Sequence, residues 1–162
     1  MLAEAKSAGL MMNARFIIVE TYSGRGLMAK DPKGVRAFHA LDVSNELLGA
    51  SIAEALHSSR WISMDEYAAY FDRERLERQS EDWIATIKEL HGYKTRKAVF
   101  TGMANCSITE RDGVVTIRPS NHEKLEGWSG KGITAADHVV LPSASSTAEL
   151  GEGARLALSR CK

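Results

Sequence analysis

The sequence has few cysteines, no long apolar run and no excess of charge of either sign. Cys106 and Cys161 are its only cysteines, and they stand far apart. No apolar run approaches the roughly 20 residues that a membrane helix needs. Residues 1–12 (MLAEAKSAGLMM) lack the basic start and the apolar core of a secretory signal. These absences predict a cytoplasmic protein with reduced thiols and without a membrane partner.

The charge balance argues against a nucleic-acid partner. The 21 Lys and Arg residues equal the 21 Asp and Glu residues in number, whereas a nucleic-acid module usually shows an excess of basic residues. A chain of 162 residues is most simply one domain. We expect residues 1–12 to be a disordered leader, or a stretch read from an upstream start codon, and residues 13–162 to form the domain.

The first part of the chain is typical of β-structure. Arg15–Thr21 (RFIIVET) is short and rich in β-branched and aromatic residues, which favours a buried strand. A glycine-containing loop follows over residues 22–26, and residues 27–29 resume as a strand. The sequence Asp31-Pro-Lys-Gly34 predicts a turn, and residues 35–41 predict a further strand.

Capping signals then predict helices. Ser44 is placed to cap a helix whose apolar face consists of Leu48, Ile52, Ala55 and Leu56. Ser63 and Glu66 form the S-x-x-E pattern of a second helix start. The apolar residues that follow change phase, so we expect two helical pieces joined or kinked across residues 72–82, with a stop at Gly92.

Strands return in the second half. We expect strands over residues 98–103 and 138–141, and between them a hairpin around Asp112-Gly113, a pair that favours a type I′ turn. Its register sets Ile108 opposite Ile117 on one face and Thr109 opposite Thr116 on the other.

A capped C-terminal helix closes the chain, since Ser146 and Glu149 form another capping box. The predicted fold class is therefore α+β. It is a single domain with a mainly antiparallel β-sheet, a helical pair inserted after the first strands and a C-terminal helix packed on the sheet.

No catalytic or metal-binding constellation stands out. His122 with Glu123, and Asp137 with His138, offer two imidazoles and two carboxylates, but adjacent residues on a strand face opposite ways. Zinc-type spacings such as C-x-x-C are missing. Structural or surface histidines are favoured over an acid–base or metal site, and an ordinary buried thiol is favoured for Cys106. We expect neither a catalytic residue nor a metal or other cofactor.

Two segments match each other in pattern. Residues 20–27 (ETYSGRGL) and 126–133 (EGWSGKGI) both contain a basic residue between glycines. Two such loops could cradle phosphate with their backbone amides, although neither has the spacing of a P-loop or of a dinucleotide fold. Two tight turns that happen to match are the simpler interpretation.

The charged segment over residues 65–82 is the strongest candidate for an interaction surface. It carries seven acidic residues, offset only by Arg73, Arg75 and Arg78. One interpretation is an acidic face for a basic partner. The other is a solvated helix face stabilised by i,i+4 ion pairs.

The C-terminal two-fifths of the chain resembles a known family. The segments FTGMANCSI, HEKLEGWSGKGI, DHVVLPSASS and ARLALSRCK occur in this order, with a D-G hairpin after the first. This combination resembles the immunity proteins of bacterial contact-dependent growth inhibition systems, the CdiI family. The resemblance implies a small cytosolic protein, not an enzyme, that binds the C-terminal toxin domain of a cognate CdiA effector. Such toxins are often nucleases and commonly basic.

The resemblance also assigns roles to residues. It marks Trp128, Gly130 and Gly132 as a signature loop with a structural role. Because a basic toxin favours a carboxylate-rich contact, it shifts the charged segment towards partner binding. The predicted partner-binding residues are Asp72, Glu74, Glu77, Glu81 and Asp82.

The alternative is a small domain that binds nucleic acid or a phosphate ligand through the glycine-rich basic loops. It would use Arg25, Lys131, Arg96 and Lys97 as phosphate contacts.

Overall fold

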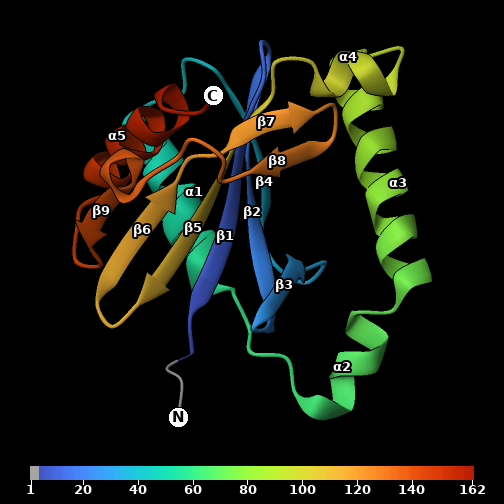
Figure 1. Ribbon diagram of the computed structural model, residues 1–162, viewed down its shortest axis with the longest axis horizontal. Helices are drawn as coiled ribbons and strands as arrows, with labels where there is room; N and C mark the ends of the chain where they lie inside the picture. The colour runs from blue at the N-terminus through green and yellow to red at the C-terminus, as the bar shows by residue number, and fades with distance from the viewer. Residues whose placement is uncertain (1–3) are drawn as a thin grey trace.

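In the computed structural model, which describes residues 4–162, an antiparallel sheet forms the centre of the molecule (Figure 1). Within these residues seven strands form the sheet in the order β3-β2-β1-β5-β6-β9, and β4 pairs separately along β2. The strands are β1 Lys6–Met12, β2 Phe16–Arg25, β3 Leu27–Lys30, β4 Arg36–Ala40, β5 Ala104–Arg111, β6 Val114–Arg118 and β9 Val139–Pro142. The predicted α+β class with a mainly antiparallel sheet is confirmed.

β1 lies in the middle of the sheet, so the predicted disordered leader is wrong for residues 6–12. The strand pairs with β2 from Ser7 to Met12 on one side and with β5 along its whole length on the other. Gly9 leaves room for the side chain of Tyr22, because an added Cβ would lie 2.5 Å from a ring carbon of Tyr22. The first residues of the predicted leader, 1–3, lie outside the described part of the chain.

The first part of the sheet also differs from expectation in its turn. β2 continues through the predicted loop at residues 22–26 as far as Arg25. Gly26, at φ +92°, is the residue between β2 and β3. The strand predicted over residues 35–41 is present as β4.

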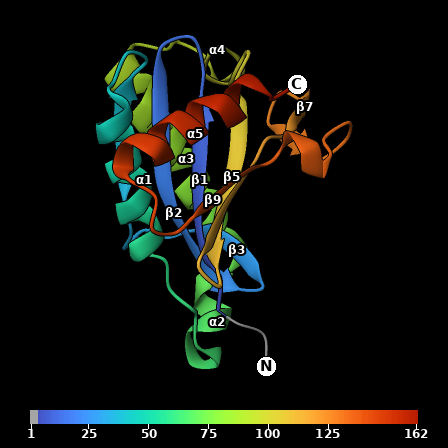
Figure 2. The same cartoon turned by 90° about the vertical axis from the view of Figure 1, so that its left-hand side faces the viewer.

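Helices α1 (Asn45–His57) and α5 (Thr147–Ser159) cover one face of the sheet. Ser44 accepts a hydrogen bond from the backbone N–H of Leu47, and the Ser146–Glu149 capping box is complete, so both predicted helix starts are confirmed. Figure 2 shows the two helices on one side of the sheet and the later β7–β8 hairpin on the other. The larger apolar core lies between these helices and the strands, and it includes the predicted apolar face of α1.

Glycines allow α1 and α5 to cross in close contact. A Cβ added to Gly49 would lie 1.7 Å from the carbonyl oxygen of Thr147, and one added to Gly151 would lie 2.0 Å from that of Asn45. No side chain fits between the two backbones at these points.

Three further helices lie along the other face and its edge: α2 Met64–Tyr70, α3 Arg73–His91 and α4 Arg96–Phe100. α3 and α4 bury a second apolar cluster against β1 and β2, which includes Trp83, Ile87 and Phe100 from the helices and Phe16 and Ile18 from the sheet. No helix within residues 4–162 is both long and apolar enough to cross a membrane.

The buried carboxylate of Glu20 fixes α3 to the sheet. Glu20, in β2, is 4% exposed and accepts a hydrogen bond of 2.8 Å from the indole Nε1–H of Trp83 in α3. Lys30 and Arg36 compensate its charge at 3.4 Å and 3.1 Å. A buried carboxylate with this set of partners holds the helix in one position.

The helix breaks fall partly where we expected them. The break lies at Phe71–Asp72, and α3 runs unbroken through the rest of the charged segment to a left-handed Gly92 at φ +69°. The strand predicted over residues 98–103 is wrong, because α4 and a turn occupy this stretch. Thr95 starts α4 by accepting the backbone N–H of Ala98.

The predicted hairpin is confirmed with its register. Ile108 pairs with Ile117 and Thr109 with Thr116, and Asp112 and Gly113 both have positive φ, as a type I′ turn requires. After β6 the chain leaves the sheet in a short hairpin, β7 Asn121–Lys124 and β8 Gly127–Ser129, and a 3-10 turn, η1 Ala135–Asp137, before it returns as β9.

Candidate partner-binding surface

The sheet face opposite α1 and α5 is uncovered over β5, β6 and β9, where no helix lies in front of it (Figure 1). Because side chains alternate along a strand, each of these strands buries one set of residues against α1 and α5 and presents the other set here. Val114 and Val140 remain 40% and 60% exposed on this side. We call this surface the open face; its residues are Asn105, Ser107, Thr109, Arg111, Val114, Thr116, Arg118 and Val140.

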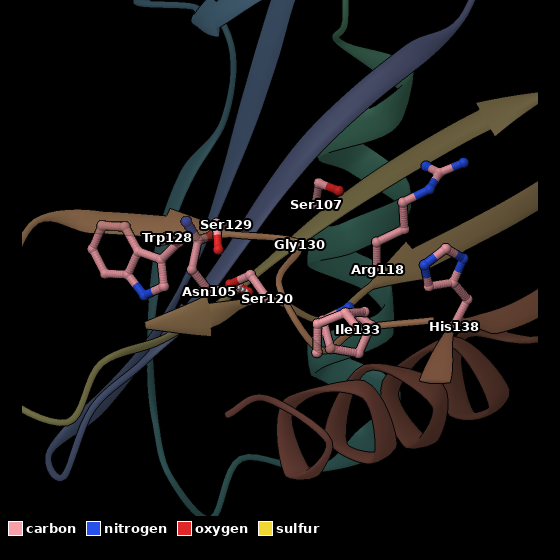
Figure 3. A pocket seen from close by; sticks show the side chains of 10 residues that line it. Asn105, Ser107, Arg118, Ser120, Trp128, Ser129, Gly130, Ile133 and His138 are labelled. Carbon is pink, nitrogen blue, oxygen red and sulfur yellow. Dashed lines mark hydrogen bonds between the residues drawn. The ribbon is translucent and has the colours of Figure 1, made fainter. Parts of the chain in front are cut away.

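The open face is hollowed at the end where β6 leaves the sheet. A pocket of about 390 Å³ lies there, lined by open-face residues and by the segment from Trp128 to His138. Figure 3 shows Arg118 and His138 close together at one end of this pocket and Trp128 at the other. A second hollow, of about 410 Å³, continues past Arg118 towards Thr109 and Arg111.

Trp128 fixes the wall of the first pocket. Its Nε1–H donates a hydrogen bond of 2.9 Å to the carbonyl oxygen of Met103, and its ring stacks on His122 with 4.8 Å between the ring centroids. Gly132 is left-handed at φ +76°, whereas a Cβ on Gly130 would meet nothing within 4 Å. These contacts support a structural role for the loop, which stays a prediction.

The charged side chains on the open face are cationic. Arg118 donates a hydrogen bond of 2.8 Å to the hydroxyl of Thr109. Neither Arg118 nor Arg111 forms an ion pair with any carboxylate of the described residues. Asp112, in the hairpin turn, is the acidic residue that borders the second hollow. Both guanidinium groups are therefore available to a ligand.

The predicted partner-binding residues lie on α3, and most already have partners. Asp72 caps the helix by accepting the N–H of Arg75 at 3.0 Å. Glu77 pairs with Arg73 at 2.9 Å, and Glu81 pairs with Arg96 at 2.9 Å. Glu74 and Asp82 are exposed. The outer surface of α3 therefore has mixed charge, and its role in partner binding stays a prediction.

One member of each histidine and carboxylate pair is engaged in local structure. His122 stacks on Trp128, and Asp137 caps the η1 turn by accepting the backbone N–H of Thr134 at 2.9 Å. That hydrogen bond lowers the pKa of Asp137. Residues 4–162 contain no group of three or more His, Cys, Asp or Glu side chains placed to hold a metal ion.

The matching glycine segments have different structures. In the first, Gly24 belongs to β2 and Arg25 lies over the ring of Trp61, 5.1 Å from its centroid. The second contains β8 and the turn that follows it, at the other end of the sheet (Figure 1). Arg96, a proposed phosphate contact, is already paired with Glu81 and Glu126. The two loops therefore do not form a joint phosphate cradle.

Both cysteines lie where β5 meets the end of the chain. Cys106 is 1% exposed, as expected of a buried thiol. Its Sγ lies 3.5 Å from that of Cys161, just beyond α5. Sequence reasoning missed this contact, because β5 and the end of α5 are brought together only by the fold.

The fold and the open face first indicate the general class of protein to which this chain belongs. An antiparallel sheet with one uncovered, hollowed polar face, beside which His122 and Asp137 are engaged in structural contacts, fits a small binding domain. The chain belongs to the CdiI family of CDI immunity proteins, whose family model matches residues 6–161.

Individual relatives agree with this assignment. The immunity protein CdiI-YPIII of Yersinia pseudotuberculosis serotype O:3 (strain YPIII) is 40% identical over 168 residues, covering 96% of this chain and 94% of the relative. The structure of a CdiA-CT/CdiI toxin and immunity complex from Yersinia pseudotuberculosis contains a chain that matches with a TM-score of 0.93 and 37% identity, and each chain is covered completely. NMB0488 from Neisseria meningitidis, described as a protein of unknown function, matches with a TM-score of 0.92 and 38% identity over 100% of this chain and 98% of that one.

Proposed function

We propose that this protein binds and neutralises the C-terminal toxin domain of a cognate CdiA effector. The observation that carries the proposal is the similarity to the Yersinia CdiA-CT/CdiI complex, which extends over the whole of both matched chains. Family membership over residues 6–161 supports it independently.

The proposed action is binding without catalysis. Among the histidines and carboxylates that an enzyme would need, His122 stacks on Trp128 and Asp137 caps a turn. The proposed place of action is the cytoplasm, where thiols such as Cys106 and Cys161 stay reduced. We further propose, on the resemblance alone, that the neutralised activity is that of a nuclease.

The direct test combines the purified chain with the toxin domain encoded beside it. We expect a one-to-one complex with a Kd of about 1 nM or below, since neutralisation inside a cell needs about −12 kcal/mol of binding free energy. The chain should also abolish nucleic-acid cleavage by the toxin in vitro. A toxin domain that neither binds nor loses its activity at saturating concentrations would disprove the function.

The acidic residues of α3 are proposed as part of the toxin contact. Reversal of Glu74, Glu77 and Glu81 to Lys should weaken toxin binding at low salt, because a basic toxin would then meet like charge. The matched control reverses Glu46, Glu54 and Glu152, which are exposed on α1 and α5. Equal affinity of the two triple variants would remove α3 from the contact.

A further inference from the structure

We propose that the open face is the docking surface for an acidic segment of the toxin domain, held by Arg111 and Arg118. The inference rests on the proposed function and names the chemistry of the contact. It assigns the main contact to cations of the sheet, whereas the sequence pointed to the carboxylates of α3.

The helices leave part of this sheet face uncovered. The β1–β2 half of this face is covered by α3 and α4, which bury Trp83 and Phe100 there. Over β5, β6 and β9 the same face has no helix, and Val114 and Val140 are 40% and 60% exposed. Exposed β-branched residues favour burial by a partner, and the small polar side chains beside them need hydrogen bonds from that partner.

The open face carries positive charge. Arg111 and Arg118 have no carboxylate partner among residues 4–162. A protein that docks on this face removes water from both guanidinium groups, which is costly unless it supplies opposite charge. The guanidinium fork fits a carboxylate with two parallel hydrogen bonds. Charge complementarity therefore selects Asp and Glu side chains on the partner.

An aromatic residue lies at each of the two ends of the open face. Trp128 forms a wall of the pocket beside Arg118. At the other end, Trp61 is 40% exposed and lines a smaller hollow with Met28 and Arg111. Trp and Arg are the residue types that most often carry the binding energy of protein interfaces. The open face thus offers apolar anchors on both sides of its cations.

A protein segment fits these observations better than a nucleic acid. A nucleic-acid site needs many phosphate contacts from a basic surface, but the open face has two arginines among neutral side chains. The whole chain has no net charge. RNA binding is therefore the outcome that the experiment must separate from toxin binding.

The first experiment reverses the two charges. The double variant Arg111→Glu, Arg118→Glu should bind the toxin domain roughly 100-fold more weakly, the range expected when one partner of a buried charge pair is lost. The control variant Lys33→Glu, Lys94→Glu changes the net charge equally at exposed sites outside these hollows, and it should bind like the natural protein. The variants Arg111→Gln and Arg118→Gln remove the charge while keeping a long polar side chain. They should also weaken toxin binding, and they serve as the test if the charge-reversed variant does not fold.

The outcomes separate the two proposals. If the natural protein binds the toxin and the double variant binds equally well, the inference is wrong and the function stands. If the natural protein does not bind the toxin at all, both fall. If the natural protein binds labelled single-stranded RNA tightly and the double variant does not, the ligand of the open face is a nucleic acid and the inference is wrong.

A second experiment identifies the partner's chemical groups. Arg118→Lys and Arg111→Lys keep the positive charge and introduce a primary amine, which a carbodiimide joins to a carboxylate in contact, with loss of water. We expect cross-linked peptides between these positions and Asp or Glu of the toxin, found by mass spectrometry. A complex that forms cross-links elsewhere but none from these positions would overturn the inference.

Discussion

Cys106 and Cys161 are two thiols of similar chemistry in different surroundings. The hydrogen bond that they share and the burial of Cys106 raise the pKa of Cys106, while the same bond lowers the pKa of Cys161 to about 6. Cys161 is half-buried and Cys106 is fully buried. Because the thiolate is the reactive form, the two residues should differ in reactivity.

Alkylation with iodoacetamide across a pH range tests this difference. We expect Cys161 to react first, with a rate that rises through a midpoint near pH 6 instead of the roughly 8.5 of an ordinary cysteine. Peptide mass spectrometry locates the label. Cys161→Ser should leave only slow labelling, and preferential labelling of Cys106 would contradict the prediction.

The signature loop gives a second prediction for single residues. Gly132 has φ +76°, so Gly132→Ala should lower the free energy of unfolding by about 1–2 kcal/mol through backbone strain. Gly130→Ala should be nearly neutral, because an added Cβ meets nothing within 4 Å. Urea unfolding compares the two variants. A larger cost at Gly130 than at Gly132 would contradict the structural role assigned to the left-handed turn.

Among the elements, the crossing of α1 and α5 depends on glycine. Gly49→Ala places a Cβ 1.7 Å from the carbonyl oxygen of Thr147, so the helices must separate. We expect a loss of about 1–3 kcal/mol in the free energy of unfolding, as for other overpacked cores. The loss should appear although alanine favours helix formation. Urea unfolding provides the measurement, Gly130→Ala is the control, and equal stability of both variants would refute a close crossing.

Elements with local signals could be predicted, and those without could not. Ser44, Ser63 and Ser146 cap their helices through contacts within three residues, and Asp112-Gly113 forms its own turn. β1 (KSAGLMM) has weak strand propensity, and its order comes from distant β2 and β5. For α4, Val99 and Phe100 suggested a strand, but the cap at Thr95 and burial against α3 prevail.

Part of the open face could be predicted from the sequence. The hairpin register already set Thr109 and Thr116 on the side opposite the core. Continued by two residues along each strand, that alternation places Arg111 and Arg118 on the same side. The sequence does not predict that these strands lack a covering helix. The positions of α3 and α4 depend on long-range contacts such as that of Trp83 with Glu20.

At the scale of the whole molecule, positive and negative residues are equal in number but unevenly distributed over the surface. α3 carries a mixed-charge surface, while the open face presents Arg111 and Arg118 with no carboxylate partner among residues 4–162. Both surfaces lie on the side of the sheet opposite α1 and α5. A toxin seated there would leave the larger core unchanged, so binding should affect stability through mass action on the folded state.

Hydrogen exchange of the complex tests that coupling. With free toxin domain at about 100 times the Kd, the free energy of global unfolding should rise by about 2.7 kcal/mol. The amides of β1 and β5 that exchange only through global unfolding should then exchange about 100-fold more slowly. The Arg111→Glu, Arg118→Glu variant at the same toxin concentration should show little slowing. Unchanged exchange in the natural protein, although the complex forms, would mean that the toxin does not require the folded sheet, which is incompatible with docking on the open face.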